Sequence, residues 1–90
     1  MMSKNEVRIS DQINPNLTIR GGAKVFFDYI ENIPGDEILI NFEGSKFISR
    51  SFAQEYVIQK RLIDKKIDEV EVPPQIESIL KLVEKSSKPN

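Results

Sequence analysis

Apolar residues recur along this chain at two spacings, one typical of strands and one of helices. Val7 and Ile9, with Ile13 as a further position, follow a period of two that predicts a short half-buried or edge strand. The run 37–42 (EILINF) is apolar and rich in β-branched and aromatic residues, which predicts a central strand covered on both faces. Over 67–72, Ile67, Val70 and Val72 are apolar and Glu69 and Glu71 alternate with the valines, as expected of a third strand with one polar face.

Between and after these runs, the apolar spacing changes to that of a helix with one buried face. The first helix is expected from Thr18, its N-cap, to just before residue 34. Ser51 and Gln54 form a capping-box pattern that opens a second helix running to about Asp64. A third helix begins near Pro74, whose missing amide hydrogen is tolerated in a first helical turn.

The resulting order, β-α-β-α-β-α, predicts an α/β fold with a small, mostly parallel sheet in two or three layers and right-handed crossovers. The order of the strands at the sheet edges stays open. Ninety residues suffice for one core, so we expect a single domain over 1–90, with its core at about 6–84 and a flexible tail at 85–90. The spacing places Tyr29 on the surface and the following aromatic residues in the core: Phe26, Phe27, Phe42, Phe47, Phe52 and Tyr56.

Composition narrows the classes of function. The formal net charge is -1, which argues against nucleic acid as a partner. The densest positive run, 60–66, is interpreted as the solvated end of the second helix. The chain has no cysteine and no histidine, the residues most used for thiolate sites, metal ligation and general base catalysis. We therefore expect a protein that is not an enzyme and uses no cofactor or metal.

No apolar run reaches the length of a membrane span or a signal peptide. We therefore expect a cytoplasmic protein with no membrane partner.

The segment 41–55 (NFEGSKFISRSFAQE) resembles the signature of STAS-like domains, which are related to sulfate-transporter and anti-sigma-factor-antagonist domains. In that signature a central strand ends at an acidic or amide residue and a glycine turn, followed by Phe-Ile and a serine-rich helix start. The segment 18–27 and the Val-Glu-Val at 70–72 also look like the pattern, so the resemblance spans about 6–84.

The resemblance implies a regulatory or adaptor domain that binds a protein, such as a histidine-kinase-like ATPase or a transcription regulator. In the antagonist class, phosphorylation of a serine at the start of the helix after the central strand dissolves the complex. This chain has Arg50 at that position, which leaves Ser49 and Ser51 as possible phospho-acceptors, with capping of the helix by Ser51 as the alternative. The expected partner-binding residues are Ser45, Ser49, Arg50, Ser51, Gln54 and Glu55, with Arg50 as the polar anchor.

Two other functions stay open. A small-ligand or nucleotide-binding module would use Arg20, Gly21 and Gly22 as an anion site, because free amides at a helix start attract anions. The spacing of a P-loop is absent, however, and close backbone packing would equally explain the glycines. A structural homodimer would form through an exposed strand or sheet face that three helices cannot cover.

Overall fold

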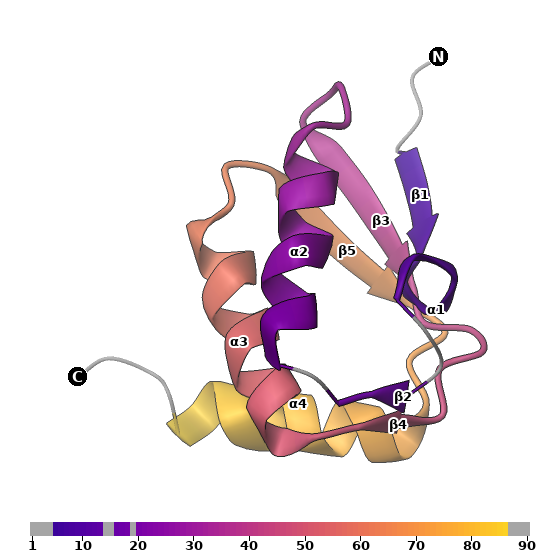
Figure 1. Cartoon of the computed structure of the whole chain (residues 1–90), viewed down its shortest axis with the longest axis vertical. Helices are drawn as coiled ribbons and strands as arrows, with labels where there is room; N and C mark the ends of the chain where they lie inside the picture. Colours follow the sequence, from indigo (N-terminus) through magenta and orange to yellow (C-terminus); the bar gives the residue numbers. More distant parts are fainter. Residues whose placement is uncertain (1–4, 14–15, 19, 87–90) are drawn as a thin grey trace.

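The computed structural model describes residues 5–13, 16–18 and 20–86, apart from the side chains of Asn16, Arg20 and Ser86. Strands and helices alternate along these residues (Figure 1). The elements are β1 (Asn5–Arg8), α1 (Ile9–Gln12), β2 (Asn16–Leu17), α2 (Arg20–Glu31), β3 (Glu37–Asn41), β4 (Phe47–Ile48), α3 (Arg50–Leu62), β5 (Lys66–Val70) and α4 (Pro74–Ser86).

The main sheet is parallel, with the strand order β1-β3-β5, so β3 is the central strand as predicted. Helix α2 connects β1 to β3 and α3 connects β3 to β5, and both crossovers are right-handed (Figure 1). The α/β fold class and the parallel sheet expected from the alternating pattern are therefore confirmed.

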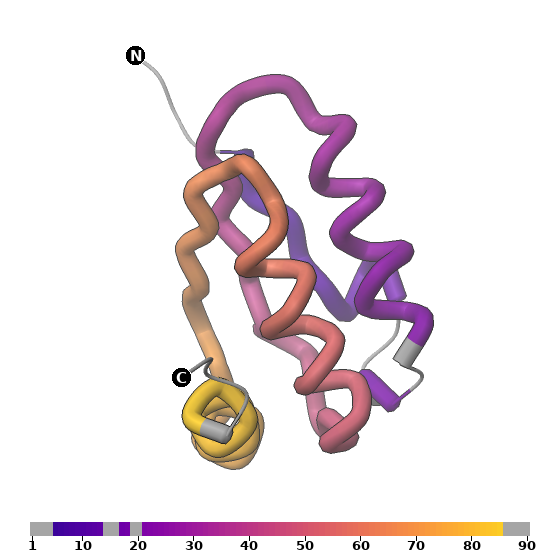
Figure 2. Tube along the Cα trace, turned by 90° about the vertical axis from the view of Figure 1, so that its left-hand side faces the viewer, coloured from indigo at the N-terminus to yellow at the C-terminus, as the bar shows by residue number. Residues whose placement is uncertain are grey.

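Helices α2 and α3 lie side by side on one face of this sheet (Figure 2). Both begin at the edge where the strands end, and α4 runs crosswise below that edge, packed against α3 (Figure 1). The domain therefore has two layers, closed by α4 at the carboxyl ends of the strands.

The helical stripes read from the sequence form most of the core. Phe26, Phe27 and Ile30 of α2 are buried, as are Phe52 and Tyr56 of α3. The rings of Phe27 and Tyr56 meet edge to face, with centroids 5.2 Å apart. The third stripe, on α4, buries Ile76, Leu80 and Val83.

The prediction that β3 is covered on both faces is wrong. Ile38 and Ile40 are fully buried beneath the helices, but Leu39, on the opposite face, is only half-buried. Asn41 shares that open face and donates a 2.7 Å hydrogen bond to Glu6 on β1. An apolar run of this length does not by itself distinguish one covered face from two.

Two predicted strands end early. β1 stops at Arg8. Ile9 begins the helical turn α1, and Ile13 is its C-cap, whose amide donates to the Ile9 carbonyl. Residues four apart satisfy a helical spacing as well as an alternating one, so the pattern was ambiguous. β5 stops at Val70 because Glu71 has φ 55, a left-handed conformation that leaves the extended strand.

Three further predictions also change. α2 begins at Arg20 instead of directly after Thr18, and residue 19 between them lies outside the described part of the chain. α4 continues through Ser86, so the first two residues of the expected tail are helical, and 87–90 are not described. A short parallel pairing of β2 with β4 was not foreseen, and it leaves Phe47, expected in the core, 49% exposed.

Candidate functional site

The loop between β3 and β4 leads into β4, and α3 begins two residues after β4 ends. Gly44 has φ 89, and a Cβ there would lie 3.0 Å from the Ser10 hydroxyl oxygen, so the turn requires glycine. Ser10 holds the same turn by donating a 3.1 Å hydrogen bond to the Glu43 carbonyl. This loop therefore has a defined path into β4.

Ser49 is the N-cap of α3. Its Oγ accepts a 3.1 Å hydrogen bond from the Phe52 amide and donates a 2.9 Å bond to the Thr18 carbonyl. Its own amide donates to Leu17 at 2.8 Å, which ties the helix start to β2. The expected cap, Ser51, is instead the second residue of the helix, because the chain becomes helical at Arg50.

Arg50 is exposed at the first position of α3. Lys46 is also exposed, and Phe47 presents half of its surface to solvent from β4. We call Lys46, Phe47 and Arg50 the docking face. The expectation that this segment is helical and offers Arg50 outward is met, whereas Phe47 was missed because a two-residue strand gives no readable alternation.

The other expected partner-binding residues differ in access. Ser51, Gln54 and Glu55 are half-buried, and Glu55 accepts a 2.7 Å hydrogen bond from Gln59. Ser45 is only 6% exposed, and its Oγ has no hydrogen-bond partner among the described residues. Burial removes Ser45 from any surface that a partner could touch.

The two candidate phospho-acceptors are 3.3 Å apart, Oγ to Oγ. The Ser49 hydroxyl is engaged as both donor and acceptor in holding the helix start, so a phosphate there would break the cap. Ser51 is the serine of this pair whose modification would leave the cap in place.

The glycines of the expected anion site differ in their surroundings. A Cβ at Gly22 would lie 3.5 Å from the ring of Phe52, so this glycine lies where α2 and α3 approach closely. Gly21 has open space around it, and the side chain of Arg20 lies outside the described part of the chain. Packing between the two helices accounts for Gly22.

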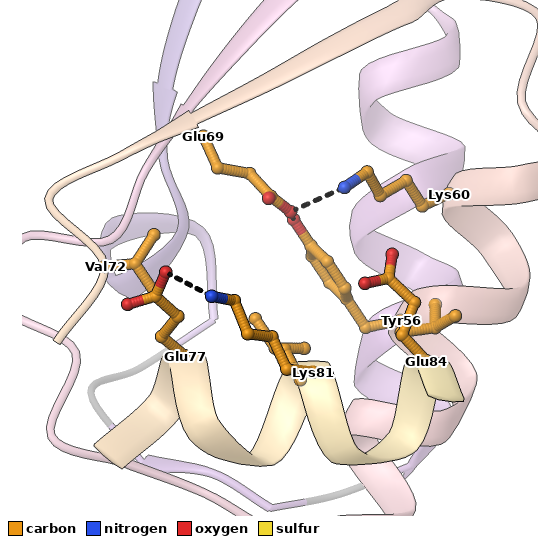
Figure 3. A pocket seen from close by; sticks show the side chains of 9 residues that line it. Tyr56, Lys60, Glu69, Val72, Glu77, Lys81 and Glu84 are labelled. Atoms are coloured by element: carbon orange, nitrogen blue, oxygen red, sulfur yellow. Dashed lines mark hydrogen bonds and ion pairs between the residues drawn. The ribbon is translucent and has the colours of Figure 1, made fainter. Parts of the chain in front are cut away.

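A polar cluster between α3, β5 and α4 was not anticipated from the sequence (Figure 3). The Tyr56 hydroxyl donates to Glu69 Oε2 at 2.5 Å, and Lys60 Nζ lies 3.2 Å from the same oxygen. Glu77 and Lys81, one turn apart on α4, form a second ion pair in the lining of a hollow of about 180 Å³. The sequence marks Glu69 only as a polar position of the third predicted strand, and no local pattern pairs it with Tyr56.

Burial, and then the charge of Glu69, raise the pKa of Tyr56 well above its usual value of 10.0. The phenol therefore keeps its proton and acts as a hydrogen-bond donor, because its anion would be both desolvated and repelled. Together, Tyr56 and Lys60 hold the Glu69 carboxylate in place.

The positive run at the end of α3 is used within the fold. Lys60 pairs with Glu69, Arg61 donates to the Glu84 carbonyl at 3.3 Å, and Lys65 donates to the Ile33 carbonyl at 2.7 Å. These contacts hold the end of α3 against its neighbours. They agree with its interpretation as a helix end rather than a phosphate-binding patch.

Within the described residues, no three acidic side chains come together as a cation site would need. None of the helices formed by the described residues is both long enough and apolar enough to cross a bilayer. Comparisons of the chain with models of protein families, with curated proteins and with solved structures give no match.

Proposed function

We propose that this chain is a non-enzymatic regulatory or adaptor domain of the STAS-like kind, which binds a protein partner through the docking face. The observation that carries the proposal is the exposure of Phe47, 49% accessible to solvent, and of Arg50, three residues later in the chain. Arginine and aromatic residues supply a large share of the binding energy at protein interfaces.

The rigidity of its support also favours a recognition role for this face. Phe47 lies on a strand paired with β2, and Arg50 begins a helix whose N-cap is bonded to two other segments. Side chains held on fixed backbone lose less conformational entropy on binding than those on free loops. The face would therefore meet its partner without rearrangement.

The charge of the face defines the chemistry of the partner. Lys46 and Arg50 are both cationic, although the chain as a whole has a net charge of -1. A matching surface would carry an apolar pocket for Phe47 beside a carboxylate that the Arg50 guanidinium contacts at two points. A histidine-kinase-like ATPase or a transcription regulator in the cytoplasm is the partner that the STAS-like resemblance suggests.

Affinity capture from a lysate of the native host, with identification of bound proteins by mass spectrometry, tests this proposal. The binding constant of the purified pair would then be measured for Phe47→Ala, Arg50→Glu and the control Leu62→Ala, a residue 72% exposed on α3. We expect Phe47→Ala and Arg50→Glu each to weaken binding at least tenfold, which corresponds to about 1.4 kcal/mol. Equal affinity of all three variants and the wild type would refute the docking face.

Binding of a small molecule is a second candidate, favoured only by the hollow beside Tyr56 and Glu69. Its volume, about 180 Å³, is below the roughly 300–1,000 Å³ of pockets that hold drug-sized ligands. Helix α4 also lies across the carboxyl ends of the strands, where open α/β sheets usually bind nucleotides (Figure 1). We therefore expect no thermal shift with nucleotides, whereas a bound ligand at a hundred times its Kd would add about 2.7 kcal/mol of stability.

A further inference from the structure

The hydrogen-bond pattern of β3 determines which backbone groups of β1 point away from the sheet. In a parallel strand, the amide and carbonyl of one residue point to the same side, and successive residues alternate. The Phe42 amide donates to Val70 at 3.0 Å, and the Lys66 amide donates to Asp36 at 2.8 Å. Even-numbered residues of the segment 36–42, which contains β3, therefore bond to β5. The odd-numbered residues of the same segment bond to β1.

The register between β1 and β3 shows which residues of β1 bond to β3. Leu39 lies opposite Glu6, and in a parallel ladder it bonds to the residues on either side of Glu6, which are Asn5 and Val7. The amides and carbonyls of Glu6 and Arg8 consequently point to the outer edge. Among the described strands β1 has a neighbour on one side only, so this edge is free to pair (Figure 1).

The side chains of Glu6 and Arg8 stand together on the open face of the sheet and are both exposed. Glu6 accepts one bond from Asn41 through Oε2. Within the described part of the chain, Arg8 has long contacts with exposed acidic residues, at 3.4 Å to Glu43 and 3.9 Å to Asp11. Contacts of this kind contribute little, so Arg8 can exchange them for a better partner.

We propose that β1 pairs antiparallel with β1 of a second copy of this chain across a two-fold axis, extending the two sheets into one. Only the outward residues, Glu6 and Arg8, can form the hydrogen-bonded pairs of such a ladder. Pairing like with like would place identical charges opposite each other. Placing Glu6 opposite Arg8 of the second copy forms two ion pairs and brings the two Val7 residues together at the axis.

The helix layer supplies apolar surface on the other side of the same edge. Tyr29 and Val25 of α2 are 44% and 68% exposed, one helical turn apart. Tyr29 lines a shallow hollow of about 450 Å³ along β1, with Val7 and Arg8. An axis perpendicular to the sheet keeps both α2 helices on one face, so these side chains would face their copies across the joint.

Charged residues on an edge strand can also serve to prevent pairing, because an exposed edge is a template for aggregation. That use of Glu6 and Arg8 predicts a monomer at every concentration. The dimer does not rest on the proposed docking function, since it uses β1 and α2 instead of β4 and the start of α3.

Sedimentation equilibrium over micromolar to millimolar concentrations distinguishes the two uses of these charges. We expect the wild type to dimerise, and Glu6→Arg and Arg8→Glu each to weaken dimerisation at least tenfold, because each variant places like charges opposite each other. Glu31→Arg and Lys85→Glu, exposed residues on α2 and α4, make the same changes in net charge away from the edge. These controls should dimerise like the wild type.

Mixing the two single variants provides the decisive result. Glu6→Arg has arginine at both positions 6 and 8, and Arg8→Glu has glutamate at both. Opposite charges then face each other when the two variants pair, so we expect the mixture to form a heterodimer at wild-type affinity. Circular dichroism of each variant checks that it is folded. A wild type that stays monomeric at millimolar concentration, or variants that dimerise as well alone as mixed, would overturn the proposal.

Discussion

Tyr56 of α3 contacts neighbouring elements through both its ring and its hydroxyl. Its ring packs against Phe27 and Phe42, and its oxygen bonds to Glu69 on the edge strand β5, where Lys60 also pairs. A buried hydroxyl bonded to a charged carboxylate contributes more than an average hydrogen bond. The contact therefore fixes α3 against β5.

Tyr56→Phe removes this hydroxyl and keeps the ring. We expect the free energy of unfolding to fall by about 1–2 kcal/mol, because Glu69 loses a bond but retains Lys60. Urea titration measures the change, and Tyr29→Phe on the surface provides the control, with an effect near zero. A loss no larger than that of the control would mean that the hydroxyl bond contributes nothing.

The raised pKa of Tyr56 gives this contribution a defined dependence on pH. Below about pH 10 the phenol is protonated in both the folded and unfolded states, so the stabilisation is complete. Above about pH 10 the unfolded chain releases the proton and the folded chain keeps it, so stability falls as pH rises toward the folded pKa.

The difference in stability between the wild type and Tyr56→Phe should therefore be constant from about pH 7 to 9 and shrink above about pH 10. Urea titrations at half-unit steps of pH would measure it. The other titratable groups are common to both proteins, so the comparison isolates the contribution of the Tyr56 hydroxyl. A difference that grows with pH would contradict the assigned direction of the pKa shift.

Glu71 holds a left-handed backbone conformation, with φ 55, between β5 and α4. Holding a residue with a side chain in this conformation costs roughly 1–2 kcal/mol of folding free energy. Glycine avoids this strain but loses more backbone entropy on folding. We therefore expect Glu71→Gly to stabilise the fold by up to about 1 kcal/mol. Glu77→Gly, in the first turn of α4, is the matched control and should destabilise. Thermal unfolding measures both, and the same sign for the two would be inconsistent with strain at Glu71.

At the scale of elements, the start of α3 depends on a single hydroxyl. Ser49→Ala removes the bond that caps the Phe52 amide, and we expect it to reduce stability by about 1 kcal/mol. Ser51→Ala, two residues later, should change stability much less because Ser51 caps no amide among the described residues. Urea titration of both variants compares them, and a larger loss for Ser51→Ala would assign the cap to Ser51.

The elements that the sequence predicted well are those with long apolar stripes. α2, α3 and α4 each bury three or more residues at helical spacing, and β3 stands out as an apolar run between turns. Over such lengths the spacing leaves little choice between helix and strand. This is why the α/β class and the central position of β3 could be predicted.

The predictions that proved wrong are those that depended on only one or two residues. Ile9 and Ile13 fit either period, and the turn at Glu71 depends on a conformation that glutamate rarely adopts. Both Ser49 and Ser51 are suitable cap residues, and the path of the chain decides between them. Phe47 is exposed because β4 pairs with β2, a contact between distant segments that no local pattern encodes.

The candidate site was predictable in part for the same reason. Arg50 lies at the start of a strongly patterned helix, so its exposure could be inferred. The Tyr56 and Glu69 contact joins residues 13 apart through the tertiary fold. Single-residue patterns carry no signal for such a pair.

At the scale of the whole molecule, the arrangement of layers determines which surfaces stay accessible to a partner. Helices α2 and α3 cover one face of the sheet, and α4 closes the strand ends (Figures 1 and 2). The features left for recognition are the docking face, the open face of the sheet and the β1 edge. The proposed binding of a protein partner and the proposed dimer would use two of these features, the docking face and the β1 edge.

Site-specific photo-cross-linking in the native host tests the central claim, that the chain recognises a protein through the docking face. A photoreactive phenylalanine analogue would replace Phe47 in one protein and Leu62, which is more exposed, in another. We predict a discrete adduct with one host protein from position 47 that is lost when Arg50→Glu is added, and no such adduct from position 62. The same adducts from both positions, or none from position 47, would contradict the claim.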